Sequence, residues 1–174
     1  MLHIRKATLE DIETLIKVGS QAFVETFAEH NTEADMQAYL STKFTQEQLN
    51  GEFNEPNATF FIAEYDSQAA GYAKLRTVEE PAQLVGKKHL ELERLYVLKA
   101  FHNKKIGKEL METCITLAKQ NDFEVLWLGV WEHNLKALEF YHKWGFERFD
   151  EHIFQLGEDK QTDYLMKLEL KSNA

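Results

Sequence analysis

Hydrophobic positions recur along the chain at two spacings, one typical of helices and one typical of strands. In the first third, apolar residues return about every three or four positions, as on the buried face of a helix. Each such segment opens with a threonine-led capping pair, whose side chains can bind backbone N–H groups that lack a partner inside the helix. These pairs are Thr8 with Asp11, Thr32 with Asp35, and Thr45 with Gln48. The pattern predicts a short strand at residues 3–6 followed by three helical segments.

The rest of the chain alternates strand and helix patterns. The predicted elements are strands at 59–65 and 71–77 around a turn at 66–68, a mobile loop at 78–88, a strand at 90–97, a helix from 106 to about 121, a strand at 125–130, a helix between Asn134 and Gly145, and closing strands at 148–156 and 163–170 around 157–160. Strands that alternate with helices, with hairpins near both ends, predict a mixed α/β sheet. Because no linker-like segment interrupts the chain, we expect a single domain spanning residues 1–174.

Composition narrows the class of protein. Apolar residues make up 44% of the chain and charged residues 28%, which is ordinary for a globular domain. No apolar run is long enough to span a membrane, and the first residues lack the apolar segment of a signal peptide, so we expect a cytoplasmic protein with no membrane partner. The net charge of −9 disfavours nucleic-acid binding and favours a cationic partner, although an acidic surface also serves solubility alone.

The single cysteine points to packing rather than chemistry. Cys114 shares a helical stripe with apolar residues of the segment 106–118, so we expect it to be buried. One cysteine excludes an internal disulfide, and the histidines show no close ligand spacing, so no metal site is expected.

A basic turn joins the predicted strand at 90–97 to the helix that begins near Ile106 and Gly107. The turn contains His102, Lys104 and Lys105. The first N–H groups of a helix lack partners and its dipole favours anions, so this turn is a candidate diphosphate site. A basic helix start that is simply solvated fits the same residues.

Several segments lie at fixed spacing along the chain: residues 92–97, the loop 102–108, residues 126–131, Asn134 and residues 137–146. Together they resemble the GNAT superfamily of N-acetyltransferases. A narrower resemblance, to PaiA-type polyamine acetyltransferases acting on spermidine and spermine, rests on Leu-Gly-Val-Trp-Glu at 128–132, Phe-x-x-Thr-Phe at 23–27 and Gln-Thr-Asp at 161–163.

The resemblance implies a fold and an activity. The expected fold is a six- to seven-stranded, mostly antiparallel sheet flanked by four to five helices, with central strands splayed to admit acetyl-CoA. The expected activity is direct transfer of an acetyl group from acetyl-CoA to a primary amine of a small polycationic acceptor such as spermidine or spermine. A peptide or ribosomal-protein N-acetyltransferase and a non-catalytic acyl-CoA-binding sensor are the alternatives. The sequence leaves open whether the closing strands form a homodimer.

The cofactor contacts implied by the basic turn and by the resemblance cover three segments. They are Leu95, Tyr96 and Val97 along the pantetheine arm, His102, Asn103, Lys104, Lys105, Ile106, Gly107 and Lys108 around the diphosphate, and Asn134 and Lys143. The family pattern has glycine where this chain has Lys105, and a side chain there restricts the conformation of the backbone and its approach to the cofactor. Lys143 as a solvated residue remains an alternative.

Catalysis needs a proton acceptor for the amine and a donor for the leaving thiolate, because an alkylamine is protonated at neutral pH. Glu91 and Glu93 lie two residues apart on one strand face, with Arg94 predicted on the opposite face, and Glu93 is the preferred base. Solvated strand glutamates are the alternative. Tyr141 matches the family's tyrosine that protonates the thiolate. The acceptor contacts expected from the acidic early helices and from aromatic residues are Glu25, Glu29 and Trp131, with Tyr39 as a further cation–π candidate.

Overall fold

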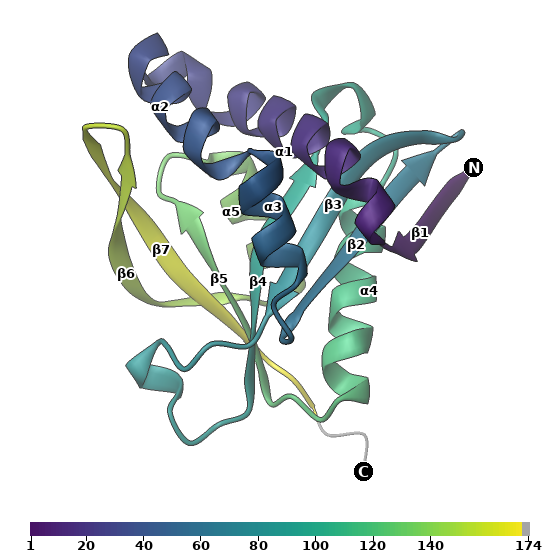
Figure 1. Ribbon diagram of the computed structural model, residues 1–174. Coiled ribbons are helices and arrows are strands. Elements are labelled where there is room, and N and C mark those ends of the chain that lie inside the picture. The colour runs from purple at the N-terminus through teal and green to yellow at the C-terminus, as the bar shows by residue number, and fades with distance from the viewer. Residues whose placement is uncertain (172–174) are drawn as a thin grey trace.

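The computed structural model describes residues 1–171 and is built around one seven-stranded sheet (Figure 1). Its strands are β1 (Leu2–Lys6), β2 (Ala58–Tyr65), β3 (Gln68–Arg76), β4 (His89–Val97), β5 (Val125–Trp131), β6 (Glu147–Leu156) and β7 (Asp159–Glu169). They are arranged in the order β1-β2-β3-β4-β5-β7-β6, and only β4 and β5 are parallel. The predicted mixed, mostly antiparallel sheet is confirmed.

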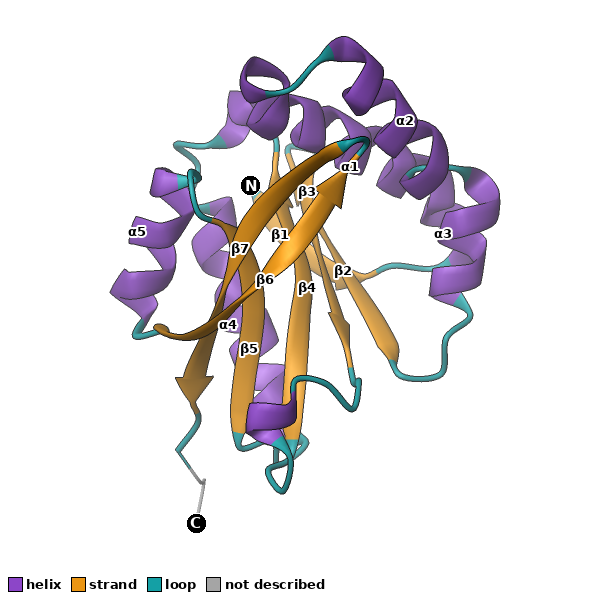
Figure 2. Ribbon diagram, turned by 90° about the vertical axis from the view of Figure 1, so that its left-hand side faces the viewer, coloured by secondary structure: helices purple, strands orange, loops and turns teal. Residues whose placement is uncertain are grey.

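Five α-helices cover the two faces of this sheet within the described residues. They are α1 (Ile12–Phe27), α2 (Glu33–Lys43), α3 (Gln46–Phe53), α4 (Ile106–Gln120) and α5 (Leu135–Trp144). Helices α1 to α3 pack on one face, whereas α4 and α5 pack on the other (Figure 2). Strand β2 shows how the sheet serves both cores, because Phe60 and Ile62 face α1 to α3 while Phe61 and Ala63 face α4.

The predicted helix starts are present. Thr32 and Thr45 accept hydrogen bonds from the backbone N–H groups of Asp35 and Gln48, both at 3.1 Å. The Thr8–Asp11 pair opens a short 3-10 turn at Leu9–Asp11 that leads into α1, so this helix begins slightly later than its cap suggests.

Both hairpin turns are tighter than predicted. Asp66 and Ser67 have positive φ angles of 48° and 65°, so two residues reverse the chain and β3 already begins at Gln68. In the second hairpin β6 ends at Leu156 and β7 begins at Asp159, several residues before the predicted start of that strand. Turn length depends on the pairing of both strands, which apolar spacing alone does not reveal.

The segment between β3 and β4, predicted to be a mobile loop, is anchored at two points. Leu84 is 1% exposed and packs in a cluster with Val125 and Trp127. The ring of His89 lies 3.0 Å from the carbonyl oxygen of Val78 and so fixes the start of the segment. A single buried leucine in an aperiodic stretch gives no pattern, which is why the sequence did not indicate this packing.

A β-bulge in β4 corrects the predicted orientation of Arg94. In the pairing with β3, Lys74 faces Arg94 and Leu75 faces Leu92, so Glu93 is the extra residue. The alternation of side chains restarts after a bulge. Glu93 and Arg94 therefore point to the same face of the sheet, the face covered by α1 to α3.

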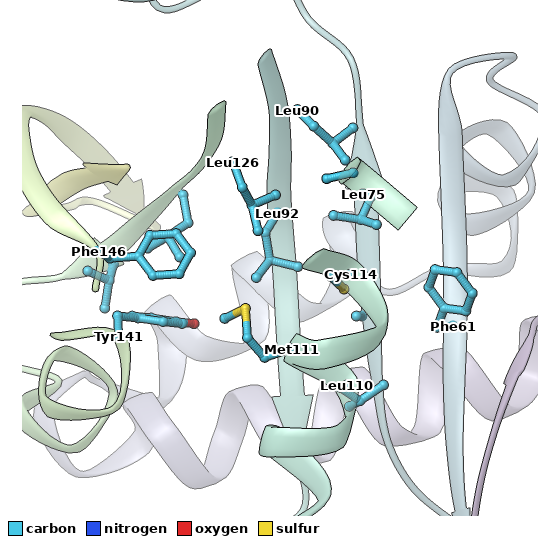
Figure 3. Close-up of a cluster of buried hydrophobic side chains, with 14 of the residues drawn as sticks. Phe61, Leu75, Leu90, Leu92, Leu110, Met111, Cys114, Leu126, Tyr141 and Phe146 are labelled. Carbon is cyan, nitrogen blue, oxygen red and sulfur yellow. The ribbon is translucent and has the colours of Figure 1, made fainter. Parts of the chain in front are cut away.

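The core beneath α4 contains the cysteine, as predicted. Cys114 is fully buried among Leu92, Leu110 and Met111 (Figure 3), and burial raises the pKa of its thiol to about 12. Within residues 1–171 no helix has the length and hydropathy needed to cross a membrane.

Candidate active site

Strands β4 and β5 lie side by side at only one end. Their parallel pairing covers three residue pairs and ends where Glu91 faces Trp127. Beyond this point β4 stays paired with β3, and β5 stays paired with β7. The two halves of the sheet therefore diverge (Figure 1), which confirms the predicted splaying of the central strands.

The far end of β4 presents main-chain groups to this gap. The N–H of Leu98 donates to the carbonyl of Ala70, on the β3 side. Because the N–H and C=O groups of successive residues in a strand alternate in direction, those of Tyr96 also point to β3, whereas those of Leu95 and Val97 point to the gap. The carbonyl oxygen of Val97 lies 2.9 Å from Nε2 of His102, consistent with this direction.

A cavity of about 850 Å³, called here the larger cavity, adjoins the gap between β4, α1, α4 and α5. Eight of the twelve residues predicted to contact the cofactor line it: Leu95, Tyr96, Val97, His102, Lys105, Gly107, Lys108 and Asn134. The remaining four lie elsewhere. Ile106 is 1% exposed in the core, Lys104 lies 5.5 Å above an aromatic ring, Asn103 is exposed outside the cavity, and Lys143 pairs with a surface carboxylate one turn earlier.

Helix α4 points its first turn at the larger cavity, and Lys105 is its N-cap. The backbone of Lys105 has φ 60° and ψ 24°, the left-handed conformation that glycine adopts without steric cost. The chain therefore follows the path that a glycine would allow, while the lysine side chain adds a positive charge. The side chains of Lys105 and Lys108 and the unpaired N–H groups of the first turn make this end of the cavity suited to an anion.

A second cavity of about 400 Å³ lies on the other side of the gap, under α1 and α2. We call it the aromatic cavity because its walls include the rings of Phe23, Phe27, Tyr39, Trp131 and Phe154. These rings contact one another, with centroids 4.3 Å apart for Phe23 and Tyr39 and 5.1 Å apart for Phe27 and Trp131. The cavity therefore offers aromatic faces to a small ligand.

One side of the aromatic cavity is a network of buried charges. Lys74 is fully buried, and its Nζ lies 2.8 Å from Glu52 and 2.6 Å from Glu93. Arg94 reaches Glu52 at 2.7 Å, and Arg76 reaches Glu93 at 3.4 Å. We call these five residues the charge network. Although burial opposes it, hydrogen bonds from Arg94 and Lys74 lower the pKa of Glu52 to about 2.

The two glutamates predicted as proton acceptors both belong to this region. Glu93 lines the aromatic cavity, but its oxygens are engaged by Lys74 and Arg76. Glu91 is 8% exposed and lies 2.6 Å from Nε of Arg76. Burial raises the pKa of Glu91, and the ion pair with Arg76 opposes that rise.

Seven residues line both cavities and lie where they meet: Thr26, Leu95, Tyr96, Trp131, Asn134, Ala137 and Tyr141. Tyr141 is 9% exposed and belongs to the core cluster shown in Figure 3, in which its hydroxyl is directed toward Met111. Burial raises the pKa of the Tyr141 hydroxyl well above its usual value. Asn134 also caps α5, since its side chain accepts from the N–H of Ala137 at 3.3 Å.

The acidic residues predicted to bind the acceptor lie apart from the aromatic cavity. Glu25 and Glu29 are exposed and line the larger cavity, and Glu25 accepts a hydrogen bond from the backbone N–H of Lys99 at 3.0 Å. Lys74 of the charge network and Asp163 also line the aromatic cavity, although the sequence alone predicts no role for either. The signals were a lysine inside an otherwise apolar strand and the last residue of the Gln-Thr-Asp motif.

Comparisons with known proteins agree with this architecture. The profile of the Acetyltransferase (GNAT) family matches residues 21–146. An uncharacterized N-acetyltransferase of Lactobacillus delbrueckii is 37% identical over 158 residues, covering 91% of each chain. The spermidine N(1)-acetyltransferase of Thermoplasma acidophilum is 29% identical over 150 residues, covering 84% of this chain and 88% of the relative. The crystal structure of the PaiA N-acetyltransferase of that organism with coenzyme A superposes with a TM-score of 0.80 at 26% identity, covering 97% and 99% of the two chains.

These matches and the splayed sheet define an N-acetyltransferase that uses acetyl-CoA. The chain belongs to the GNAT family. The larger cavity suits this co-substrate, because it joins free main-chain groups of β4 to a basic helix start and adjoins the aromatic cavity at Tyr141.

Proposed function

We propose that the protein transfers the acetyl group of acetyl-CoA to a primary amine of a small polycationic acceptor, with spermidine as the representative substrate. The observation that carries this proposal is the aromatic cavity, which meets the larger cavity at Tyr141. Aromatic faces attract ammonium groups and also cover the methylene segments between them. The net charge of −9 and the relative named spermidine N(1)-acetyltransferase support the same acceptor class.

In this proposal acetyl-CoA supplies the thioester, and residues of the larger cavity hold it. Leu95 and Val97 offer main-chain hydrogen bonds to the pantetheine arm, as an added strand would receive them. Lys105, Lys108 and the first N–H groups of α4 bind the diphosphate. His102, Gly107 and Asn134 line the same cavity.

The transfer forms a C–N bond between the amine and the acetyl carbon and breaks the C–S bond of the thioester. Negative charge then develops on the departing sulfur. Tyr141 donates its phenolic proton to that sulfur, a task for which a buried, protonated phenol where the two cavities meet is suited.

The proposal is tested by following free thiol when the protein is incubated with acetyl-CoA and a panel of amines. The panel contains spermidine, spermine and a peptide that begins with alanine. We expect turnover with the polyamines. Release with the peptide alone would instead assign a peptide N-acetyltransferase, and release with no amine would contradict the proposal.

A matched variant links the acceptor to the aromatic cavity. Phe154 lines this cavity but not the larger one. Phe154→Leu removes one ring, so we expect the KM for spermidine to rise by about threefold or more while the KM for acetyl-CoA is unchanged. An unchanged KM for spermidine would place the acceptor elsewhere.

A further inference from the structure

Asp163 carries a carboxylate that lies at the junction of three strands. In the sheet, Asp163 of β7 faces Trp131 on β5 and His152 on β6. The side chain is 16% exposed and lines the aromatic cavity, as Tyr141 does. Gly129 on β5 leaves space beside it, since a Cβ built there would lie 3.6 Å from Oδ2 of Asp163.

Asp163 differs from the other carboxylates that line the aromatic cavity. Glu52 and Glu93 are paired with lysine and arginine side chains of the charge network, and Glu55 is exposed at the rim. Within residues 1–171, Asp163 accepts no hydrogen bond and has no lysine or arginine at ion-pair distance. Its nearest basic group is Nε2 of His152 at 3.8 Å. A largely buried carboxylate without a lysine or arginine partner favours an incoming ammonium group.

The surroundings of Asp163 tune its proton affinity. Burial raises the pKa of the Asp163 carboxyl to about 6, and the charge of His152 opposes that rise. A group that titrates close to the working pH exchanges protons most effectively. The other titratable and charged groups that line the aromatic cavity are Tyr39 and Lys43 from α2, Glu52 and Glu55 from α3 and the loop after it, Tyr141 from α5, and Lys74, Arg76, Glu93, Arg94 and Tyr96 from β3 and β4.

We propose that Asp163 is the proton acceptor for the substrate ammonium group, a catalytic residue, and that His152 positions and tunes it. This inference rests on the proposed amine acetylation. The ammonium group gives one proton to the Asp163 carboxylate, and the neutral amine then forms the C–N bond. Once the C–S bond breaks, the nitrogen still holds one proton in excess of the amide. That proton leaves to solvent, and the sulfur receives a proton from Tyr141. Solvent then returns a proton to Tyr141 and takes up the proton held by Asp163.

The test compares wild type with Asp163→Asn across about pH 5 to pH 9, on an amine that the wild type acetylates. We expect wild-type kcat/KM to rise to a plateau through an apparent pKa of about 6. The variant should lose about 10²-fold or more at neutral pH and recover as pH approaches the pKa of the amine itself, because the substrate then arrives already neutral. Binding of CoA should be unchanged.

Two further variants separate this role from a structural one. Glu158→Gln removes an exposed carboxylate from the same hairpin and should leave the profile unchanged. His152→Gln removes the charge that opposes the raised pKa of Asp163, so the acidic limb should shift to higher pH while the plateau stays within about threefold.

The results distinguish this inference from the proposed function. Wild-type turnover on spermidine decides the proposed acceptor, whereas Asp163→Asn decides the proton acceptor on whichever amine of the panel reacts. The inference is overturned if Asp163→Asn retains the acidic limb and at least about a third of wild-type kcat/KM. It is also overturned if the variant loses CoA binding in parallel with turnover, since a proton acceptor does not hold the cofactor.

Discussion

At the scale of single residues, Tyr141 combines a packing role with the chemical role that we propose for it. Its ring lies against Phe146 (Figure 3), with centroids 5.6 Å apart. The residue also lines both cavities. Burial raises the pKa of the hydroxyl, which is therefore protonated across neutral pH, as an ordinary tyrosine also is and as a proton donor must be. The motif predicted this residue, and the fold adds that the buried tyrosine lies where the two cavities meet.

Tyr141→Phe should therefore lower kcat by about 10²-fold or more while CoA binding is retained, because the ring still packs and only the proton is lost. Steady-state kinetics and calorimetric CoA binding check this. Tyr164→Phe removes the same atom outside both cavities and serves as the control. Unchanged turnover in Tyr141→Phe would refute the assignment of the acid.

Substitution of Asp163 should stabilise the protein at neutral pH, whereas most substitutions destabilise a protein. The pKa of Asp163 is higher in the folded chain, about 6, than its ordinary value of 3.8, so the folded state loses stability as pH rises between these values. At neutral pH the buried charge costs up to about 3 kcal/mol. Asp163→Asn should stabilise the protein by a large part of this above pH 6 and by little below pH 4, measured by urea unfolding at several pH values. Destabilisation at neutral pH would contradict the predicted cost.

At the scale of elements, local sequence patterns predicted the helix starts correctly, whereas features that depend on contacts between distant segments were not predicted. The caps at Thr32 and Thr45 depend on residues three positions away, so the sequence contains all the information needed. The bulge at Glu93 depends on the register with β3, which no local pattern encodes. For the same reason the charge network, which joins α3 to β3 and β4, could not be predicted.

The start of α4 provides a test of backbone conformation. Lys105 lies in the left-handed region, which costs a non-glycine residue about 1 kcal/mol or more. Lys105→Gly should raise the free energy of unfolding by up to about 1 kcal/mol, whereas Lys104→Gly, where the conformation is ordinary, should not. Denaturant unfolding measures both. A Lys105→Gly variant less stable than wild type would show that side-chain contacts outweigh the strain.

The charge network should make the stability of the protein depend strongly on Glu52 of α3. Glu52→Gln leaves Lys74 buried without its full set of anionic partners, so we expect destabilisation of about 3–5 kcal/mol. Since the pKa of Glu52 is lowered to about 2, the stability it contributes is present above its ordinary value of 4.5 and is lost as pH falls toward 2. The exposed Glu47→Gln on the same helix should change stability by no more than about 0.5 kcal/mol. Equal stability of the two variants would contradict the role of the network.

At the scale of the whole molecule, the sheet consists of two halves joined by three residue pairs of β4 and β5. Their divergence leaves the larger cavity on one side and the aromatic cavity on the other, with seven lining residues in common. The order of elements and the basic turn could be predicted from periodicity and motifs. The sequence could not predict how the acidic residues are divided between the cavities. Glu25 and Asp163 are far apart in sequence, and only the packing of α1 against the sheet assigns each to its cavity.

The proposed function requires the two adjoining cavities to bring acetyl-CoA and a polycationic amine together at Tyr141. Its most direct test is mass spectrometry of spermidine incubated with the protein and acetyl-CoA labelled in the acetyl group. We expect monoacetylated spermidine that carries the label and accumulates in proportion to the amount of protein. Label that remains on CoA would contradict the proposed function.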